Sequence, residues 1–434
     1  MGTVWRNWAG TVSATPAQWV RPGSVAEISA AVRSAASAGL TVRALGSGHS
    51  FTPIAACADA VALDLSGFTG IVSADAGTGV VTVRSGTRLG ALNKSLAAMG
   101  LAMANLGDID VQTLAGALAT GTHGTGSGLG GLATQVLGMS LVLADGSEVS
   151  CSGGSALFDA ARVGLGSLGV VTTVTLQCVP AFSLVAEESP EPVDSVLASF
   201  DSLAASNDHF EFYWFPYGRK ALVKRNNRQA QSPPPPPMSA WRKYWEFEVM
   251  ENTAFGVLCR LGRAVPRLIP SLGRLTSASL SRRSYTAASY EVFVTPRRVR
   301  FVESEYAVPR ESLLDVLAEL RRAVPRLATP VMFPVEVRVA APDDIWLSTA
   351  YGRESGYVAI HQFAGLPYQE YFDMFESVVA GVGGRPHWGK MHSLDAARLA
   401  ELYPKFEDFR RVRAEVDPEG RFLNPYLNRV LGAD

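Results

Sequence analysis

A glutamate and an arginine lie two positions apart in a run of valines. The stretch Val335-Glu336-Val337-Arg338-Val339 alternates strictly between apolar and charged residues. Successive side chains of a β-strand point to opposite faces, so Glu336 and Arg338 share one face and the valines share the other. This pair could bind substrate hydroxyl groups and stabilise negative charge on a substrate oxygen. The charged face could also simply be exposed to solvent, and the pattern alone does not decide between the two.

A second alternating stretch contributes a histidine. Residues 357–363 read Tyr-Val-Ala-Ile-His-Gln-Phe, which predicts a strand with His361 and Phe363 on one face. Such a histidine could line a pocket, or it could be a hydrogen-bonded residue of the core. His387 and His392 have a spacing that could suit two metal ligands, but no third ligand pattern accompanies them. We therefore predict no metal site.

Two glycine-rich loops provide a signal for a bound phosphate. One reads Arg-Ala-Leu-Gly-Ser-Gly-His-Ser over residues 43–50 and follows a predicted strand; the other spans residues 116–126. Glycines let the backbone approach a ligand closely, and successive amide groups can form a concave site for a pyrophosphate. Either loop alone could be a tight turn, but the two together favour a binding site.

Two further stretches match the Gly-x-Gly-x-x-Gly pattern of dinucleotide-binding loops, at residues 126–131 and 164–169. That pattern requires a strand before it and a helix after it. Both stretches are followed by sequence typical of β-structure, so we predict no Rossmann-type site.

Several motifs together resemble one known family. They are GSGHS at residues 46–50, ATGTHGTG at 119–126, GVVT at 169–172, EVR at 336–338, HWGK at 387–390 and FLNPY at 422–426. This combination resembles the vanillyl-alcohol oxidase family of FAD flavoproteins, in its sugar-1,4-lactone oxidoreductase and alditol oxidase branch, and within it the L-gulono-1,4-lactone oxidoreductases. The likeness covers essentially the whole chain.

The resemblance implies an α+β fold of two domains. A PCMH-type FAD-binding domain would span residues 1–180, and an α+β substrate or cap domain would span residues 181–395. A C-terminal segment, residues 396–434, would complete the FAD domain. The active site would lie at the junction of the two domains.

The implied cofactor is FAD, bonded covalently through His49, with a non-covalent histidine that packs on the flavin as the alternative. His123 is expected to bind backbone around the cofactor rather than to act in catalysis. The other residues that the resemblance places at the cofactor are Arg43, Gly46, Ser47, Gly48, Ser50, Gly107, Asp108, Gly116, Thr120, Gly121, Thr122, Gly124, Gly169, Val170, Val171 and Lys390.

The implied catalytic residues are Glu336, Arg338, His361 and Lys390. Lys390 would hold the negatively charged reduced flavin or lower the pKa of the hydroxyl that is oxidised. The implied substrate-binding residues are Asp108, Glu336, Arg338, His361 and Phe363.

The expected reaction is the oxidation of an L-gulono- or L-galactono-type 1,4-lactone, with hydride transfer to flavin N5. Asp108 and Phe363 stand where alditol oxidases carry a serine and a threonine, which favours a cyclic lactone over an open polyol. An alditol oxidase acting on xylitol or sorbitol is the first alternative. A flavin-binding protein without turnover is the second.

The electrons would pass to O2 or to another acceptor. The resemblance places Gly107 on the side of the flavin where oxygen approaches. Glycine has no side chain to block this path, so we expect oxidase behaviour.

Composition fits a globular enzyme. The 434 residues are 47% hydrophobic and 18% charged, with a formal net charge of -1. This balance favours neither nucleic acid nor an anionic membrane surface as the main partner. No membrane span or secretion signal is evident, and four separated cysteines indicate reduced thiols, so we expect a cytoplasmic protein. The sequence does not indicate which oligomeric state the protein adopts.

Local patterns predict the main elements. Ser24 and Glu27 form a capping box that begins a helix ending near Ala38. Thr87 is expected to cap a helix that ends near Gly100, and Asp145-Gly146 to form a two-residue hairpin turn. Strands are expected at 41–45, 79–86, 136–144, 148–151, 169–179, 209–215, 331–339 and 357–363, helices at 192–205, 309–323 and 367–379, and an exposed proline loop at 233–237.

Overall fold

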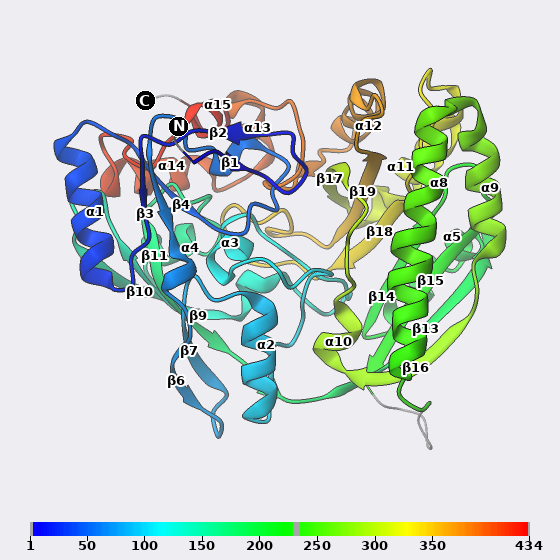
Figure 1. Cartoon of the computed structure of the whole chain (residues 1–434), viewed down its shortest axis with the longest axis horizontal. Coiled ribbons are helices and arrows are strands. Elements are labelled where there is room, and N and C mark those ends of the chain that lie inside the picture. Colours follow the sequence, from blue (N-terminus) through cyan, green and yellow to red (C-terminus); the bar gives the residue numbers. More distant parts are fainter. Residues whose placement is uncertain (1–2, 229–234, 433–434) are drawn as a thin grey trace.

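The computed structural model describes residues 3–228 and 235–432. Figure 1 shows the N-terminal elements and the C-terminal helices on one side of the molecule, and the elements between residues 183 and 386 on the other. Pro233 and Pro234 of the expected proline loop lie outside the described residues, while 235–237 have no regular secondary structure. None of the helices within the described ranges is both long and apolar enough to cross a membrane.

Two small sheets form the N-terminal side. A parallel sheet has the order β3 (Gln18–Val20), β5 (Val61–Asp64), β4 (Val42–Leu45). An antiparallel sheet has the order β10 (Glu148–Ser152), β9 (Val136–Val142), β11 (Val170–Gln177), β7 (Val80–Arg84), β6 (Ile71–Asp75). The remaining elements are β1 (Trp5–Arg6), β2 (Ser13–Ala14), β8 (Leu101–Ala102), β12 (Val179–Pro180), α1 (Val25–Ser37), α2 (Leu89–Ala98), α3 (Leu114–Ala119) and α4 (Ala156–Ala161).

The start of α1 confirms the expected capping box. Ser24 Oγ accepts a hydrogen bond from the Glu27 amide at 3.3 Å, and the Glu27 carboxylate accepts one from Gly23 N at 2.9 Å. The expected cap of α2 is wrong, because Arg88 occupies the cap position. The Thr87 hydroxyl is used elsewhere, since it donates to the Arg84 carbonyl and accepts from Gly70 N.

The hairpin of β9 and β10 forms, but its loop is longer than expected. Leu143 N donates to Ser147 O and Gly146 N donates to Leu143 O, which encloses three loop residues rather than two. Gly146 has φ +80°, a left-handed conformation that glycine adopts without strain. Asp145 stabilises the turn by accepting the Ser147 amide at 2.8 Å.

An eight-stranded antiparallel sheet dominates the other side. Its order is β16 (Arg283–Ala288), β13 (Ser183–Pro192), β15 (Lys220–Arg228), β14 (His209–Trp214), β18 (Val335–Ala340), β19 (Ser355–Phe363), β17 (Phe301–Pro309), β20 (Arg385–Pro386). One face packs on α11 (Leu313–Ala323) and α12 (Gln369–Ala380), where Val335, Val337 and Val339 join the hydrophobic core. The expected helix at 192–205 is divided at Ser199 into α5 (Val193–Ala198) and α6 (Phe200–Ala205).

A helical segment that the sequence patterns did not predict lies at the edge of this sheet. It consists of α7 (Ala240–Lys243), a π-helix (Tyr244–Ala254), α8 (Phe255–Ala264) and α9 (Ile269–Ser279), followed later by α10 (Ser289–Phe293). Figure 1 shows α8 and α9 side by side at the outer edge of the molecule.

The C-terminal helices return to the N-terminal side. They are α13 (Ala396–Leu402), α14 (Phe406–Val416) and α15 (Pro425–Leu431). Phe406, Phe409 and Leu427 share one hydrophobic core with Val81 and Met139 of the five-stranded sheet. The chain's end therefore packs with its beginning, while the expected boundaries at 180 and 395 stay a prediction.

Candidate active site

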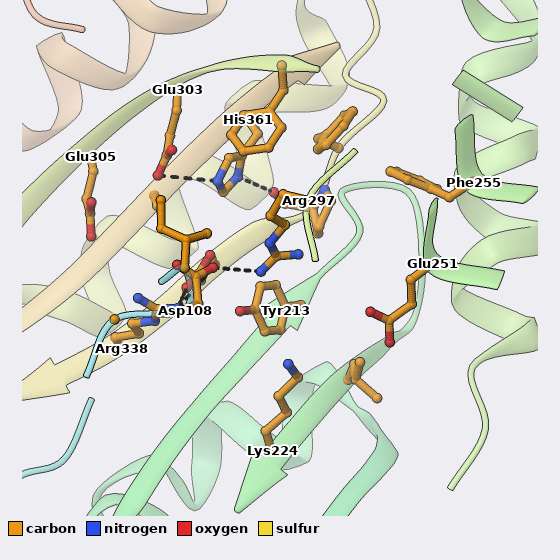
Figure 2. A pocket seen from close by; sticks show the side chains of 18 of the residues that line it. Asp108, Tyr213, Lys224, Glu251, Phe255, Arg297, Glu303, Glu305, Arg338 and His361 are labelled. Atoms are coloured by element: carbon orange, nitrogen blue, oxygen red, sulfur yellow. Dashed lines mark hydrogen bonds and ion pairs between the residues drawn. The ribbon is translucent and has the colours of Figure 1, made fainter. Parts of the chain in front are cut away.

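A cavity of about 360 Å³ lies between the N-terminal loops and the polar face of the eight-stranded sheet. Its charged wall comes from four adjacent strands, because Tyr213 of β14 pairs with Glu336 of β18, and Glu303 of β17 pairs with His361 of β19. Figure 2 shows Tyr213, Glu303 and His361 of this wall on neighbouring strands. Glu336 lies on the cavity face, whereas the valines of the same strand lie on the helix-packed face.

Arg338 lies at the centre of one charge cluster. Its Nε donates to Glu211 Oε2 at 2.8 Å, its terminal nitrogen contacts the Glu336 carboxylate, and that nitrogen lies 3.6 Å from Asp108 Oδ2. Asp108 is held from the other side by Arg297, at 2.7 Å. Both cations are therefore fixed by carboxylates before a ligand arrives.

The pKa values in this cluster follow from burial and proximity. Burial alone would lower the pKa of the Arg338 guanidinium, but Glu336, Glu211 and Asp108 raise it well above its usual range. Burial raises the pKa of the Glu336 carboxyl, and the Asp108 and Glu211 charges raise it further against the effect of Arg338. Arg338 thus stays charged, and Glu336 binds a proton more readily than an ordinary glutamate.

Lys390 forms a second cluster with two glutamates of β17. Its ammonium contacts the Glu303 carboxylate and lies 3.8 Å from Glu305 Oε2. His361 Nε2 is 3.4 Å from Glu303 Oε1, and its Nδ1 is 3.0 Å from the Pro334 carbonyl, to which it donates. Burial disfavours both charged forms, but Glu303 outweighs it and raises the pKa of Lys390 and of His361. A protonated His361 can donate from both ring nitrogens.

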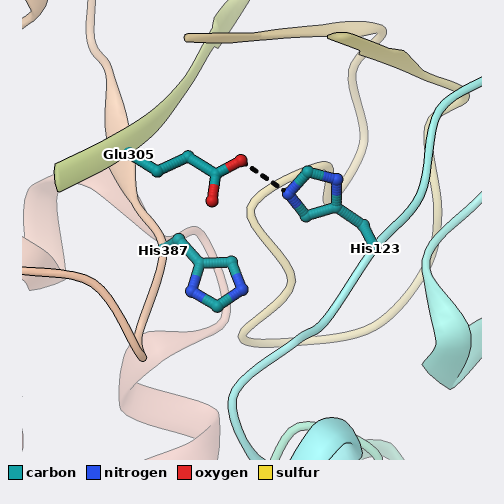
Figure 3. Close-up of side chains that lie close together, drawn as sticks. All are labelled: His123, Glu305 and His387. Atoms are coloured by element: carbon teal, nitrogen blue, oxygen red, sulfur yellow. Dashed lines mark hydrogen bonds and ion pairs between the residues drawn. The ribbon is translucent and has the colours of Figure 1, made fainter. Parts of the chain in front are cut away.

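Three potential metal ligands meet beside this cluster. Nitrogen and oxygen atoms of His123, Glu305 and His387 lie within 4.8 Å of one another (Figure 3). Each already has a protein partner: His123 Nε2 lies 2.9 Å from Glu305 Oε1, and His387 Nδ1 accepts from Gly389 N at 3.0 Å. With the Lys390 ammonium also 3.8 Å from Glu305, this donor set favours a hydrogen-bonded network over a cation site.

His387 and His392, whose spacing could suit two metal ligands, have separate partners, and the group of three potential ligands includes only His387. His392 Nε2 lies 3.0 Å from the Tyr426 hydroxyl. Burial, followed by the positive charge of Lys390, lowers the pKa of His387 to about 4, although Glu305 acts in the opposite direction. Burial and Arg429 lower that of His392 to about 3. Both rings are therefore neutral at neutral pH.

A second cavity of about 110 Å³ extends from the first one between the two glycine loops. The two cavities share His49, Ser50, Gln112 and Thr120. A Cβ atom added to Gly46 would lie 2.8 Å from Thr113 Oγ1, so the loops approach too closely for a side chain there. This narrow, two-part space can receive an elongated ligand.

The donors along this space suit FAD. Within the described residues, the backbone N–H groups of residues 47–50 donate to no protein acceptor, and so remain available for a pyrophosphate. Gln112 Oε1 and Ser85 Oγ are buried without a hydrogen-bond partner and line the second cavity. Buried polar atoms normally have partners, so these atoms indicate a polar ligand.

His49 lies where the two cavities meet. Its ring stacks on Trp8 with centroids 5.5 Å apart. Burial, followed by the positive charges of Lys390 and Arg88, lowers its pKa to about 4. The imidazole is therefore neutral at neutral pH and faces the space that a flavin ring would occupy.

The structure brings most expected site residues to the two cavities. The residues that line them are Arg43, Gly46, Ser47, Gly48, His49, Ser50, Gly107, Asp108, Gly116, Thr120, Thr122, His123, Gly169, Val171, Glu336, Arg338, His361 and Lys390.

Four expected residues do not line either cavity: Gly121, Gly124, Val170 and Phe363. Val170 faces α1 rather than the loops, and it is fully buried in a hydrophobic core. Phe363 packs behind Phe333, with ring centroids 6.4 Å apart, so Phe333 and not Phe363 reaches the cavity. Arg43 lines the second cavity, but its guanidinium donates to the carbonyl groups of Ile54, Gly166 and Phe422.

Sequence reasoning missed several polar and charged residues of the cavity wall. They are Tyr213, Lys224, Arg297, Glu303 and Glu305. It also missed Glu211, which does not line the cavity but binds Arg338. Glu303 and Glu305 lie two positions apart in β17, as Glu336 and Arg338 do in β18, but the residue between them is the polar Ser304, so the alternating signal is weaker there. Arg297 lies in a loop before β17, where no periodic signal exists.

Fold and site together define an FAD-binding oxidoreductase. Residues 16–152 match the FAD binding domain model, and residues 174–430 match the D-arabinono-1,4-lactone oxidase model. The chain belongs to the D-arabinono-1,4-lactone oxidase family and is an FAD-dependent enzyme of that family. Membership of a family of enzymes speaks against the alternative of a flavin-binding protein without turnover.

Individual relatives agree with this assignment. The L-gulono-1,4-lactone dehydrogenase of Mycobacterium tuberculosis is 43% identical, covering 100% of both chains. The alditol oxidase of a Streptomyces species is 33% identical, covering 99% of this chain and 100% of the relative. The structure of cholesterol oxidase from Brevibacterium sterolicum superposes with a TM-score of 0.85 at 16% identity, covering 99% of this chain and 96% of that one. This last likeness confirms the α+β fold, and the match of residues 16–152 to the FAD binding domain model confirms its PCMH-type FAD domain.

Proposed function

We propose that this enzyme oxidises a hydroxyl carbon of an L-gulono- or L-galactono-type 1,4-lactone, with FAD bonded to His49. The observation that supports it is the contiguous polar wall of β14, β18, β19 and β17, which faces the cavity beside His49. A small sugar derivative carries several hydroxyl groups, and this wall offers both acceptors and charged donors at close spacing. The Mycobacterium tuberculosis relative and the matching family model both carry the names of enzymes that act on a sugar 1,4-lactone.

When bound, FAD supplies the acceptor for the two electrons of the oxidation. The protein's task is to orient the substrate and to manage charge and protons. The Glu336 carboxylate accepts hydrogen bonds from substrate hydroxyls, and Arg338, whose guanidinium is already held by Glu211, stabilises negative charge on the substrate oxygen. His361 and Lys390, joined through Glu303, stand ready to receive or donate protons near that oxygen.

The attachment of FAD through His49 is supported by position and protonation state. A neutral imidazole has a free lone pair, which bond formation to the flavin's 8α carbon requires, and burial keeps His49 neutral. Denaturing the purified protein with acid tests the attachment. A yellow pellet supports the covalent bond, while a colourless pellet under a yellow supernatant refutes it.

An alditol oxidase is the second candidate, and one observation favours it. Phe363 does not reach the cavity, so it no longer argues against an open polyol. Asp108 remains, and its carboxylate is held by Arg297 and Arg338 rather than being free for a polyol chain. We retain the lactone as the first proposal.

Turnover assays distinguish these substrates. Oxygen uptake and reduction of an artificial dye should be recorded in parallel with L-gulono-1,4-lactone, L-galactono-1,4-lactone, xylitol and sorbitol. We expect both lactones to be oxidised faster than both polyols. Turnover of polyols alone would refute the lactone proposal, and lactone turnover with the dye but not with oxygen would identify a dehydrogenase.

The acceptor and the compartment are further proposals. Gly107 lines the cavity, and its missing side chain supports O2 as an acceptor. All four cysteines are free and buried, which supports a reducing compartment such as the cytoplasm.

A further inference from the structure

The helical segment at the edge of the sheet has an unusually apolar outer surface. Nine of the fourteen exposed large hydrophobic side chains in the described residues fall within residues 241–275. These nine are Trp241, Tyr244, Trp245, Met250, Val257, Leu261, Val265, Leu268 and Leu275, of which Met250 also lines the first cavity. Exposed apolar side chains scattered singly need no explanation, but a gathered patch marks an interaction site.

The exposed apolar residues continue from α8 into the connection that follows it. Val257 and Leu261, four positions apart, share one face of α8, while Val265 and Leu268 lie after the helix ends at Ala264, in the connection to α9. The inward side of α8 carries Cys259, which is fully buried in a core beneath the helices. The segment therefore carries apolar residues on its outer side as well as its inner side, and among the described residues only the inner ones join a hydrophobic core.

The same segment has a strong local charge. Residues 252–290 contain six arginines and no aspartate, glutamate or lysine. Arg283 is buried between Glu188 and Glu251. The other five, Arg260, Arg263, Arg267, Arg274 and Arg282, are exposed, and none of them lies within ion-pair distance of a carboxylate in the described part of the chain.

The glutamates of the neighbouring π-helix do not offset this charge. Glu248 is bound by Arg298 at 2.8 Å, and Glu251 is bound by Arg283 at 2.6 Å. Glu246 lies 3.8 Å from Arg242 and 3.7 Å from Arg283. The outer surface is therefore apolar and cationic, although the whole chain has a net charge of -1.

We propose that the α8–α9 surface, made of the apolar residues above other than Met250 and of the five exposed arginines, binds an anionic membrane surface without crossing it. An amphipathic helix lies in the membrane interface when apolar residues enter the acyl boundary and arginines meet anionic head groups. Trp241, Tyr244 and Trp245 add aromatic side chains that favour this interface. The proposal does not depend on the substrate assigned above.

Charge distinguishes this partner from a second copy of the chain. In a symmetric dimer the same patch would face itself, and each exposed arginine would lie near like charges. An anionic lipid surface instead offers matching charge over the whole area. The net charge of -1 averages over the whole chain and so does not reveal this local excess of arginines.

Vesicle flotation of the full FAD-loaded protein tests the proposal. We expect binding to vesicles that contain phosphatidylglycerol, little binding to phosphatidylcholine alone, and weaker binding at high salt. Arg267→Glu should weaken partitioning at least about fivefold, since one arginine near an anionic surface contributes on the order of that factor. Leu261→Glu, which places a charge on the apolar stripe, should weaken it similarly.

Matched control variants distinguish a specific effect on this surface from the general effect of adding a glutamate. Leu137→Glu is the control for Leu261→Glu, because the two leucines are 43% and 42% exposed. Arg326→Glu changes an exposed arginine elsewhere. Both controls should bind vesicles like the unaltered protein, and all four variants should keep its turnover because none touches the cavity.

Three outcomes would overturn the proposal. The first is no binding to anionic vesicles, and the second is equal loss in the controls. The third is the absence of vesicle binding together with a dimer, measured by light scattering, that the Leu261→Glu substitution dissociates. This result would assign the surface to a second copy of the chain.

Discussion

Replacing Arg338 by methionine tests whether this guanidinium holds the surrounding carboxylates in place. Arg338 is 7% exposed, contacts Glu211 and Glu336, and lies 3.6 Å from Asp108. Methionine retains a flexible apolar stem but removes the charge. Removing one partner of a buried ion pair typically costs about 3 to 5 kcal/mol, because the other charge stays buried without compensation.

The structure places the expected cost at the lower end of that range. Asp108 keeps Arg297 at 2.7 Å and Glu211 keeps Lys224 at 3.6 Å, so only Glu336 loses its cation. We therefore expect a loss of about 3 kcal/mol at neutral pH. Unfolding entropy for a chain of 434 residues is about 0.9 kcal/mol per kelvin, so the melting temperature should fall by roughly 3 °C.

Scanning calorimetry of the FAD-loaded protein measures this change. The double variant Arg338→Met with Glu336→Gln should recover most of the loss, since it removes the uncompensated charge together with its partner. The loss should also shrink as pH falls, because Glu336, whose pKa burial raises, then becomes protonated. A double variant as unstable as the single one would refute this account of the cluster, as would a loss that does not change with pH.

Three further predictions concern other parts of the site. His49→Ala should leave a colourless acid-precipitated pellet while FAD still binds; a yellow pellet would show another attachment point. Gly107→Ala places a Cβ 3.1 Å from Thr122 Cγ2, so oxygen-dependent turnover should fall severalfold while dye-dependent turnover persists; equal losses would argue against an oxygen path. His387 is neutral in the fold with a pKa of about 4, so its share of stability is present above pH 6.5 and is lost as pH falls toward 4, by roughly 3 kcal/mol. His387→Gln should flatten the dependence of melting temperature on pH over that interval, and an unchanged slope would contradict this assignment.

Local patterns predicted the elements whose signal is complete within a few residues. Ser24 and Glu27 fixed the start of α1, and the alternation over 335–339 fixed both the strand and its two faces. The cap of α2 was mispredicted because the Thr87 hydroxyl donates to the nearby Arg84 carbonyl and accepts a hydrogen bond from Gly70, which lies seventeen positions away. No window around residue 87 contains that information.

The helices between residues 240 and 279 were not predicted from the sequence, for a different reason. Their apolar residues serve two surfaces, and the π-helix over 244–254 departs from the usual period, so no single 3.6-residue stripe appears in the sequence.

The candidate site could be predicted where one strand carried the whole signal. Arg338 and Glu336 belong to a single strand, so their shared face followed from spacing alone. Glu211 and Arg297 join them only through strand pairing and a loop conformation, which are properties of the assembled sheet. The predicted strand face of Phe363 did not suffice to place its ring in the cavity, because Phe333 from another segment packs against it on that side.

The two faces of β18 also limit how this chain can change in length. Because side chains alternate with a period of two, inserting or deleting one residue within the strand would turn the charged pair into the helix-packed core and expose valines to the cavity. An inserted or deleted residue could be accommodated only outside the strand, for example just before it at Pro334. Descendants of this sequence can therefore substitute a residue within the strand without shifting the alternation, but they can gain or lose residues only in the connections between strands.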